Sequence, residues 1–132
     1  MSYRGSETIL LAEDEEAVCS LVRGVLESRG YDVLEAKGAY DALEIGGRHK
    51  KHIHLLLTDV VMPQVSGREL AEHLAPLHPE TKVLYMSGYA DHAVVHHGLL
   101  EPGTVFLQKP FTPDALARKV REVLDGVGGQ RT

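Results

Sequence analysis

The chain has 132 residues, of which 43% are hydrophobic and 25% are charged, and its formal net charge is −5. These values are typical of one soluble globular domain, and the negative charge disfavours a nucleic-acid surface, which is normally basic. No stretch of the sequence is long and apolar enough to cross a bilayer, and the polar residues 1–5 do not resemble a signal peptide. The single cysteine, Cys19, cannot form an internal disulfide, which fits a reducing compartment. We therefore expect one cytoplasmic domain over residues 1–132, with a core from about 7 to 126, loose termini and no membrane contact.

Five short apolar stretches predict buried β-strands. In chain order they are Thr8–Ala12, Tyr31–Ala36, Ile53–Thr58, Val83–Met86 and Val105–Leu107. The second stretch alternates between apolar and polar residues, which is typical of a strand near a sheet edge. The third contains three consecutive leucines, Leu55 to Leu57, as expected for a strand that is covered on both faces.

The segments between these strands predict helices. The first expected helix runs from Val18 to Leu26 with Gly30 as its cap, and the second from Ala39 to Ile45, ended by Gly46-Gly47. The third starts at the Ser66-x-x-Glu69 capping box and carries Leu70, Ala71, Leu74 and Leu77, and a short fourth helix runs from about Asp91 to His97. The last starts at Thr112-Pro113, ends at Gly126 and carries Leu116, Val120, Val123 and Leu124. Strands that alternate with helices predict an α/β fold, a doubly wound five-stranded parallel sheet with helices on both faces.

Functional-looking side chains follow four of the five predicted strands. Glu13 and Asp14 follow the first strand, Asp59 the third, Ser87 the fourth and Lys109 the fifth. Each of them alone is an ordinary surface or turn residue. Because the carboxyl ends of parallel strands share one edge of a sheet, where ligands bind in such folds, their joint occurrence indicates a site.

The chemistry of this group indicates phosphoryl transfer. Three carboxylates within reach of one another repel unless a cation is present, and oxygen ligands completed by water suit Mg²⁺. Lys109 adds positive charge and Ser87 a hydrogen-bond donor. A carboxylate beside these groups can act as a nucleophile toward phosphorus, and we assign that role to Asp59.

The same residues resemble the receiver domain of response regulators in two-component signalling. The resemblance rests on Glu13-Asp14, Asp59-x-x-Met62-Pro63-x-x-x-Gly67, Ser87-Gly88 and Lys109-Pro110-Phe111, and it covers the chain from about Glu7 to Gly126. It implies a flavodoxin-like fold of three layers with strand order 2-1-3-4-5. It also implies a regulatory phosphoacceptor rather than an enzyme, with intrinsic phosphotransfer and self-dephosphorylation. The implied partner is a histidine kinase or a histidine phosphotransfer domain, and not nucleic acid.

Individual roles follow from this resemblance. Asp59 would be the phosphorylation site, and Glu13, Asp14, Asp59 and the backbone carbonyl of Val61 would hold Mg²⁺. Lys109 would contact the phosphoryl group, with a cis peptide before Pro110. Because Glu13 stands where aspartate is also frequent, its longer side chain would reach the ion through water.

The resemblance also implies a switch, in which Ser87 turns toward the phosphoryl group and Phe106 turns inward behind it. This would repack the face formed by the fourth helix, fifth strand and fifth helix, through which a homodimer could form. Phe106 has no hydroxyl group, so only packing could hold its position. Val61 and Tyr89 correspond to positions that flank the path of hydrolytic water. Since neither side chain can orient water, we expect slow self-hydrolysis.

Two other functions share part of this chemistry. A dehalogenase-like phosphohydrolase also uses an aspartyl nucleophile, Mg²⁺ and a lysine, but its nucleophile follows the first strand in an Asp-x-Asp motif. A flavodoxin-like FMN module would need a phosphate loop rich in glycine and hydroxyl groups after the first strand, where this chain has acids. The segment Gly5–Leu11 and the sequence Met86-Ser87-Gly88-Tyr89 resemble receivers of hybrid sensor kinases more than stand-alone regulators.

The histidines and the cysteine have no predicted functional role. Six of the eight histidines fall in two groups, His49, His52 and His54, and His92, His96 and His97. Only His92 and His96 have the spacing of one helix face, so solvated surface histidines are favoured over a metal site. Cys19 is expected to pack as a small apolar residue.

Overall fold

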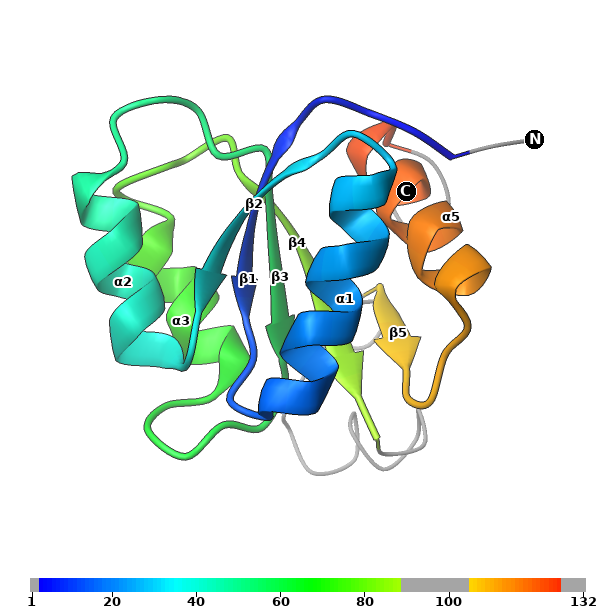
Figure 1. Ribbon diagram of the computed structural model, residues 1–132. Helices are drawn as coiled ribbons and strands as arrows, with labels where there is room; N and C mark the ends of the chain where they lie inside the picture. The colour runs from blue at the N-terminus through cyan, green and yellow to red at the C-terminus, as the bar shows by residue number, and fades with distance from the viewer. Residues whose placement is uncertain (1–2, 89–104, 127–132) are drawn as a thin grey trace.

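The computed structural model describes residues 3–88 and 105–126, and its centre is a five-stranded parallel sheet (Figure 1). The strands are β1 (Thr8–Ala12), β2 (Asp32–Ala36), β3 (Leu55–Asp59), β4 (Lys82–Ser87) and β5 (Phe106–Gln108). Their order across the sheet is β2-β1-β3-β4-β5, so β2 forms one edge. The doubly wound sheet, its strand order and the edge position of the second strand are therefore confirmed.

Helices cover both faces of the sheet, which makes three layers (Figure 1). They are α1 (Glu16–Ser28), α2 (Ala39–Arg48), α3 (Gly67–Leu74) and α5 (Pro113–Leu124). Helices α1 and α5 pack on one face, and α2 and α3 on the other. The helix expected from about Asp91 to His97 falls outside the described residues. Among the helices that the structure does describe, none has the length and apolar composition needed to cross a membrane.

Most of the core lies in two apolar clusters separated by the central strands, and a smaller one forms around Val60 and Tyr85. In β3, Leu55 and Leu57 point toward α1 and α5, while Leu56 points toward α2 and α3. All five residues of β3 are buried, as are Ile9 to Ala12 of β1. Since every apolar residue of these strands meets a helix on one side or the other, the unbroken apolar runs of the sequence are explained.

The helix ends match the expected capping residues. The Ser66 hydroxyl accepts from the Glu69 amide, while the Glu69 carboxylate accepts from the Ser66 amide, so the predicted capping box is present. The Thr112 hydroxyl accepts from the amide of Ala115 at the start of α5. Gly30 follows α1 with φ of 102°, a left-handed conformation that glycine adopts without strain.

Two helix predictions were wrong in detail. Gly46 and Gly47 do not end α2 but lie within its last turn, and the helix runs on to Arg48. A Cβ atom at Gly46 would lie 2.6 Å from Leu74 Cδ1, so this glycine permits the close packing of α2 on α3. Helix α3 ends at Leu74, and Leu77 lies beyond it with half of its surface exposed.

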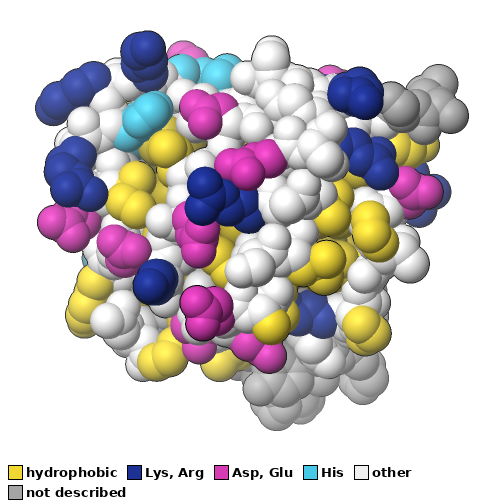
Figure 2. Space-filling view, viewed as in Figure 1, with side chains coloured by type: hydrophobic (Ala, Val, Ile, Leu, Met, Phe, Trp, Pro, Cys, Tyr) yellow, Lys and Arg dark blue, Asp and Glu magenta, His cyan; other side chains and the backbone are white. Residues whose placement is uncertain are grey.

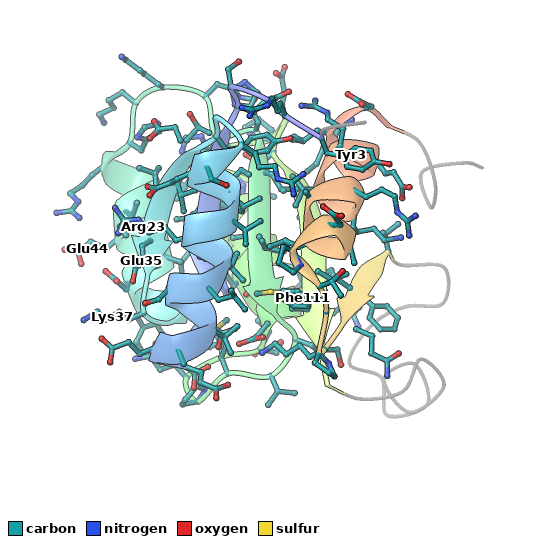
Figure 3. The ribbon with its side chains drawn as sticks, turned by 45° about the vertical axis from the view of Figure 1, so that its right-hand side comes forward. Tyr3, Arg23, Glu35, Lys37, Glu44 and Phe111 are labelled. Carbon is teal, nitrogen blue, oxygen red and sulfur yellow. The ribbon has the colours of Figure 1, made fainter. Side chains whose placement is uncertain are left out.

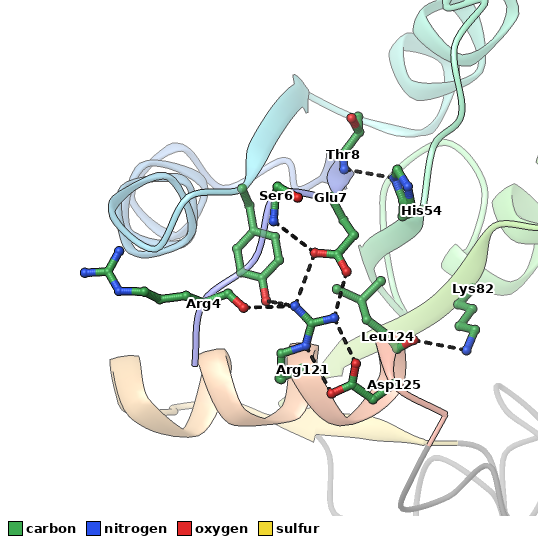
Figure 4. Close-up of polar contacts among 10 residues, drawn as sticks. Arg4, Ser6, Glu7, Thr8, His54, Lys82, Arg121, Leu124 and Asp125 are labelled. Atoms are coloured by element: carbon green, nitrogen blue, oxygen red, sulfur yellow. Dashed lines mark hydrogen bonds and ion pairs between the residues drawn. The ribbon is translucent and has the colours of Figure 1, made fainter. Parts of the chain in front are cut away.

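Arg121 of α5 fastens the N-terminal segment to the rest of the domain (Figure 4). Its guanidinium group donates to the Arg4 carbonyl at 2.9 Å, to both Glu7 carboxylate oxygens at 2.7 and 3.2 Å, and to the Tyr31 hydroxyl at 3.1 Å. It also contacts Asp125 one turn further along the helix. The hydrogen bond from Arg121 lowers the pKa of Glu7 to about 2.

Cys19 lies in the core beneath α1 and has only 2% of its surface exposed, which confirms its expected packing role. Nearby, Arg23 of α1 and Glu35 of β2 approach each other (Figure 3), with Nη1 and Oε1 2.7 Å apart. Burial, with a hydrogen bond to Glu35, raises the pKa of the Cys19 thiol to about 12. The thiolate that reactive cysteines need is therefore disfavoured here.

Gly67, at the start of α3, is pressed against the end of β3. Its amide donates to the Val60 carbonyl at 2.8 Å, and a Cβ atom there would collide with the backbone carbonyl of Asp59. Its φ is not positive, so the requirement for glycine comes from space rather than from backbone conformation. The glycine lets the loop after Asp59 fold back tightly over the strand end.

We expect Gly67→Ala to lower the free energy of unfolding by about 2 kcal/mol, because the added methyl group must displace a backbone carbonyl. Urea unfolding followed by circular dichroism measures this change.

Gly24→Ala is the matched control. Gly24 lies in α1 and is exposed, and a Cβ atom there would have no neighbouring atom within 4 Å, so alanine should stabilise the helix by about 0.5–1 kcal/mol. Equal effects of the two substitutions would contradict the argument from space at Gly67.

Candidate functional site

A cavity of about 360 Å³ opens at the carboxyl edge of the sheet. It brings together residues from the ends of four strands, and its lining is Glu13, Asp14, Glu15, Asp59, Val60, Val61, Met86, Ser87, Gly88 and Lys109. The five side chains that the sequence singled out after the strands are all among them. Residues almost a hundred positions apart in the chain thus share one small space.

Lys109 lies between two buried carboxylates. Its Nζ is 2.7 Å from Asp59 Oδ1 and 3.2 Å from Glu13 Oε1. The side chains of Glu13 and Asp59 are 1% and 7% exposed, so little solvent screens these contacts. The ammonium group compensates part of the negative charge that the two strands place here.

The backbone holds these side chains in position. The Val60 amide donates to the Met86 carbonyl at 3.0 Å, which ties the end of β3 to β4. The Lys109 amide donates to the Ser87 carbonyl at 2.8 Å, which extends the β4–β5 pairing by one residue. The peptide between Lys109 and Pro110 is cis, as the resemblance implied. The geometry of the site is therefore set by the sheet itself.

Glu13 is oriented by a contact that the sequence did not indicate. Its Oε2 accepts a hydrogen bond from the Glu15 amide at 3.0 Å, while its Oε1 accepts from Lys109. The carboxylate thus turns back under its own loop into the cavity and is buried, whereas the neighbouring Asp14 is exposed.

The acidic residues suit a hard divalent cation. One carboxylate oxygen from each of Glu13, Asp14 and Asp59 lies within 4.8 Å of the other two. Ligand oxygens on opposite sides of one Mg²⁺ are about 4.2 Å apart, because each Mg–O distance is about 2.1 Å. Only a small side-chain adjustment separates this arrangement from a shared coordination sphere, and the donors are all oxygen.

Burial makes Asp59 a weaker acid than an ordinary aspartate. Burial, together with a side-chain hydrogen bond to Glu13 and the charge of Glu13, raises the pKa of Asp59 to about 7, although Lys109 acts in the opposite direction. Burial also tends to lower the pKa of Lys109, but the carboxylates of Asp59 and Glu13 outweigh it, so that pKa is raised. The carboxylate form of Asp59 therefore needs further positive charge near it.

The remaining predicted residues lie around this centre. Val61 lines the cavity with 51% of its surface exposed, and Ser87 is buried at the cavity wall. Phe106 of β5 is half-buried and packs against the cluster of Val60 and Tyr85. Tyr89 falls outside the described residues. The switch role of Ser87 and Phe106, and a dimer through the surface around β5 and α5, stay predictions.

The histidines that the structure describes are only partly as expected. His52 is exposed, but His54 is half-buried and its Nδ1 accepts from the Thr8 amide at 3.0 Å. His54 is thus a structural contact rather than a solvated side chain. His92, His96 and His97 are not among the described residues.

We expect the metal-free protein to lose stability as the pH rises from about 4 to about 7. In this range the folded state keeps a proton on Asp59 (pKa about 7) that the unfolded state, with an aspartate pKa of about 3.9, has released. Asp59→Asn removes this dependence, so in the presence of EDTA it should be more stable than the parent by about 4 kcal/mol at pH 8 and nearly equal to it at pH 4. Urea unfolding across this pH range measures the difference.

Asp32→Asn, an exposed carboxylate on β2, is the control and should show no such pH-dependent gain. Added Mg²⁺ should stabilise the parent at pH 8 and leave Asp59→Asn largely unchanged. A constant difference between parent and Asp59→Asn from pH 4 to pH 8 would contradict the proposed burial of a protonated carboxyl.

Comparison with known proteins places this site in a family. The family model described as "Response regulator receiver domain" matches residues 9–121. The chain is 40% identical over 121 residues to the sensor kinase CckA of Brucella abortus, covering 92% of this chain but 13% of that kinase. It is 31% identical to the response regulator receiver protein CpdR of the same organism, covering 88% of this chain and 95% of that protein.

The fold agrees with these sequence relationships. The crystal structure of the receiver domain from the hybrid histidine kinase CckA superposes with a TM-score of 0.75 at 36% identity, covering 89% of this chain and 98% of that one. The matched region begins at the second residue of β1 and ends within α5, so it includes every residue of the cavity. The chain belongs to the response-regulator receiver domain family of two-component signalling.

Proposed function

We propose that Asp59 accepts a phosphoryl group from the phosphohistidine of a histidine kinase or a histidine phosphotransfer domain. The observation that supports this most directly is the convergence of Asp59, Lys109 and two further carboxylates on one cavity, with Lys109 Nζ 2.7 Å from Asp59 Oδ1. A buried carboxylate beside an ammonium group and a cation site is suited to attack on phosphorus. The domain then acts as a regulatory phosphoacceptor.

The transfer exchanges one bond for another. A carboxylate oxygen of Asp59 forms a bond to phosphorus, the bond between phosphorus and the histidine nitrogen breaks, and the electron pair of that bond stays on the imidazole. Asp59 must be deprotonated to attack, and its pKa of about 7 means that the positive charges around it decide how much carboxylate is present. Lys109 is placed to contact the phosphoryl oxygens once they arrive.

The residues that would hold Mg²⁺ are Glu13, Asp14, Asp59 and the backbone carbonyl of Val61. When bound, the ion neutralises charge on the phosphoryl oxygens and favours the carboxylate form of its ligands. Glu13 is already fixed by Lys109 and by the Glu15 amide, so we propose that it contributes through a water molecule rather than by direct contact. Asp14 is exposed and free to turn toward the ion.

Two alternative functions fit the site less well. In a dehalogenase-like phosphohydrolase the nucleophile follows the first strand, but here the first strand ends in the buried Glu13, which is held by Lys109. An FMN module would place phosphate beside Glu13 and Asp14, where the negative charges would repel it. The family match to a phosphoacceptor supports neither alternative.

We propose further that the domain works in the cytoplasm as the receiver of a hybrid histidine kinase. Support comes from the sequence identities, which are 40% to the CckA kinase and 31% to CpdR. The chain covers 95% of CpdR, so CpdR has about the length of a single receiver domain. The residues encoded on both sides of this chain in its gene decide between the two contexts. A kinase core encoded upstream in the same reading frame supports the hybrid form. In-frame stop codons directly before residue 1 and directly after residue 132 exclude it.

Acetyl phosphate with Mg²⁺ should add one phosphoryl group, about 80 Da, to the parent protein and none to Asp59→Asn, because the attacking oxygen is lost. Intact-protein mass spectrometry measures the product. EDTA should abolish the reaction.

Asp32→Asn, which changes an exposed carboxylate outside the cavity, should react like the parent. Phosphorylation of Asp59→Asn to the same extent as the parent would exclude Asp59 as the acceptor. A mass gain of the parent that persists in EDTA would exclude the proposed metal dependence.

We also propose that the aspartyl phosphate is long-lived, because the side chain of Val61 at the mouth of the cavity cannot orient water. Replacing Val61 by Asn together with Tyr89 by Glu should shorten the half-life of the phosphorylated protein by about ten-fold, equivalent to about 1.4 kcal/mol in the barrier. Loss of the mass increment over time measures it.

Leu21→Asn is a matched control, since Leu21 lies on α1 and, like Val61, is 51% exposed. It should leave the half-life unchanged. A parent half-life already as short as that of the double variant would contradict the proposal.

A further inference from the structure

A second cavity, of about 320 Å³, lies at the opposite end of the sheet from Asp59. It is formed by the last turn of α2, the loop between α2 and β3, and the turn before β4. Its lining is Gly46, Gly47, His49, Lys50, Lys51, His52, Leu77 and His78. None of these residues belongs to the phosphoacceptor site, so this cavity is separate from it.

Positive charge is concentrated around this cavity. The seven residues from Arg48 to His54 include three cationic side chains and three imidazoles, although the whole chain carries a formal charge of −5. Figure 2 shows Lys and Arg side chains with histidines beside them at the upper left, over this loop, whereas acidic side chains gather at the lower edge near the strand ends. A local group of positive charges thus lies over the loop between α2 and β3.

The cations at this cavity differ from most others in the structure. Seven described Lys and Arg side chains make ion pairs, namely Arg23, Arg29, Arg68, Lys109, Arg118, Lys119 and Arg121. Within residues 3–88 and 105–126, no ion pair involves Arg48, Lys50 or Lys51, and all three are exposed. Their charge is therefore available to a ligand.

Stabilisation of α2 accounts for only part of this charge. A cation in the last turn of a helix interacts favourably with the helix dipole, and Arg48 occupies that position. Lys50 and Lys51 lie beyond the end of the helix, where this interaction has fallen off. The helix dipole therefore does not account for their position beside the cavity.

Polar groups in the cavity wall point to the same conclusion. His78 Nε2 lies 2.8 Å from the Gly46 carbonyl, which fixes that imidazole in the wall. His49 Nε2 is buried and has no hydrogen-bond partner in the described part of the chain. Gly47 has open space where a side chain would be, so a ligand can lie against the last turn of α2. The exposed ammonium groups of Lys50 and Lys51 and the exposed imidazole of His52 are typical anion ligands.

We propose that this cavity binds a free, phosphate-bearing small molecule. Its volume suits a compact ligand, and Leu77, which is half exposed, offers an apolar wall for the organic part. A nucleic acid or an anionic membrane would extend beyond the patch onto a protein of net charge −5, whereas a compact anion fits within the patch itself. The proposal does not depend on phosphorylation of Asp59.

Inorganic pyrophosphate is the probe, added to the full chain without divalent metal so that the carboxylate cavity cannot hold it. Backbone amide NMR should show saturable shifts at Gly47, His49, Lys50, Lys51 and His78, with half-saturation at about 1 mM or below. Lys50→Glu combined with Lys51→Glu should weaken binding at least ten-fold. If that variant fails to fold, Lys50→Gln with Lys51→Gln serves instead.

Arg118→Glu combined with Lys119→Glu changes the net charge equally on α5 and should bind pyrophosphate like the parent. Two other ligands are added separately as competitors: vesicles that contain phosphatidic acid, and an aspartate-rich peptide. Neither should displace pyrophosphate. Shifts that do not saturate, equal weakening by both charge-reversed variants, or stronger binding to the vesicles or the peptide than to pyrophosphate would each overturn the proposal.

Discussion

Two buried carboxylates, Glu13 and Asp59, face one ammonium group at the carboxyl edge of the sheet, and the organisation of the domain follows from this unbalanced charge. Lys109 contacts both at 3.2 and 2.7 Å, but one positive charge cannot neutralise both acids and the exposed Asp14 beside them. Burial, together with the neighbouring Glu13, raises the pKa of Asp59. The proposed Mg²⁺ would balance part of this negative charge.

The parallel sheet makes this convergence possible. Strands β1, β3, β4 and β5 all run in the same direction, so their carboxyl ends deliver side chains to one edge, and the helices on both faces leave that edge open. Gly67 lets the loop after Asp59 fold back against β3 without obstructing the cavity. At the other end of the sheet the chain concentrates positive charge around a second cavity, next to the loop between α2 and β3.

Much of the fold was predictable because its signals are local. The unbroken apolar run of β3, the capping box at Ser66 and the glycine after α1 each depend on residues within a few positions of one another. One of the two helix errors occurred where a distant residue lies against the chain. Gly46 is a residue expected to end α2, yet it continues the helix because Leu74 of α3 packs against it. The Arg121 contacts with Arg4 and Glu7 span more than 110 residues and have no local signature.

For the site, the residues that carry chemistry and the strand that each one follows could be predicted from the sequence, since strand ends and acidic, hydroxyl and lysine side chains can be recognised along the chain. The distances between these side chains and their burial arise only in the folded chain. It placed Lys109 between Glu13 and Asp59, turned the Glu13 carboxylate back onto the Glu15 amide, and buried Asp59 enough to raise its pKa. The physical reason is that desolvation and charge pairing depend on through-space proximity across the sheet, which no spacing along the chain expresses.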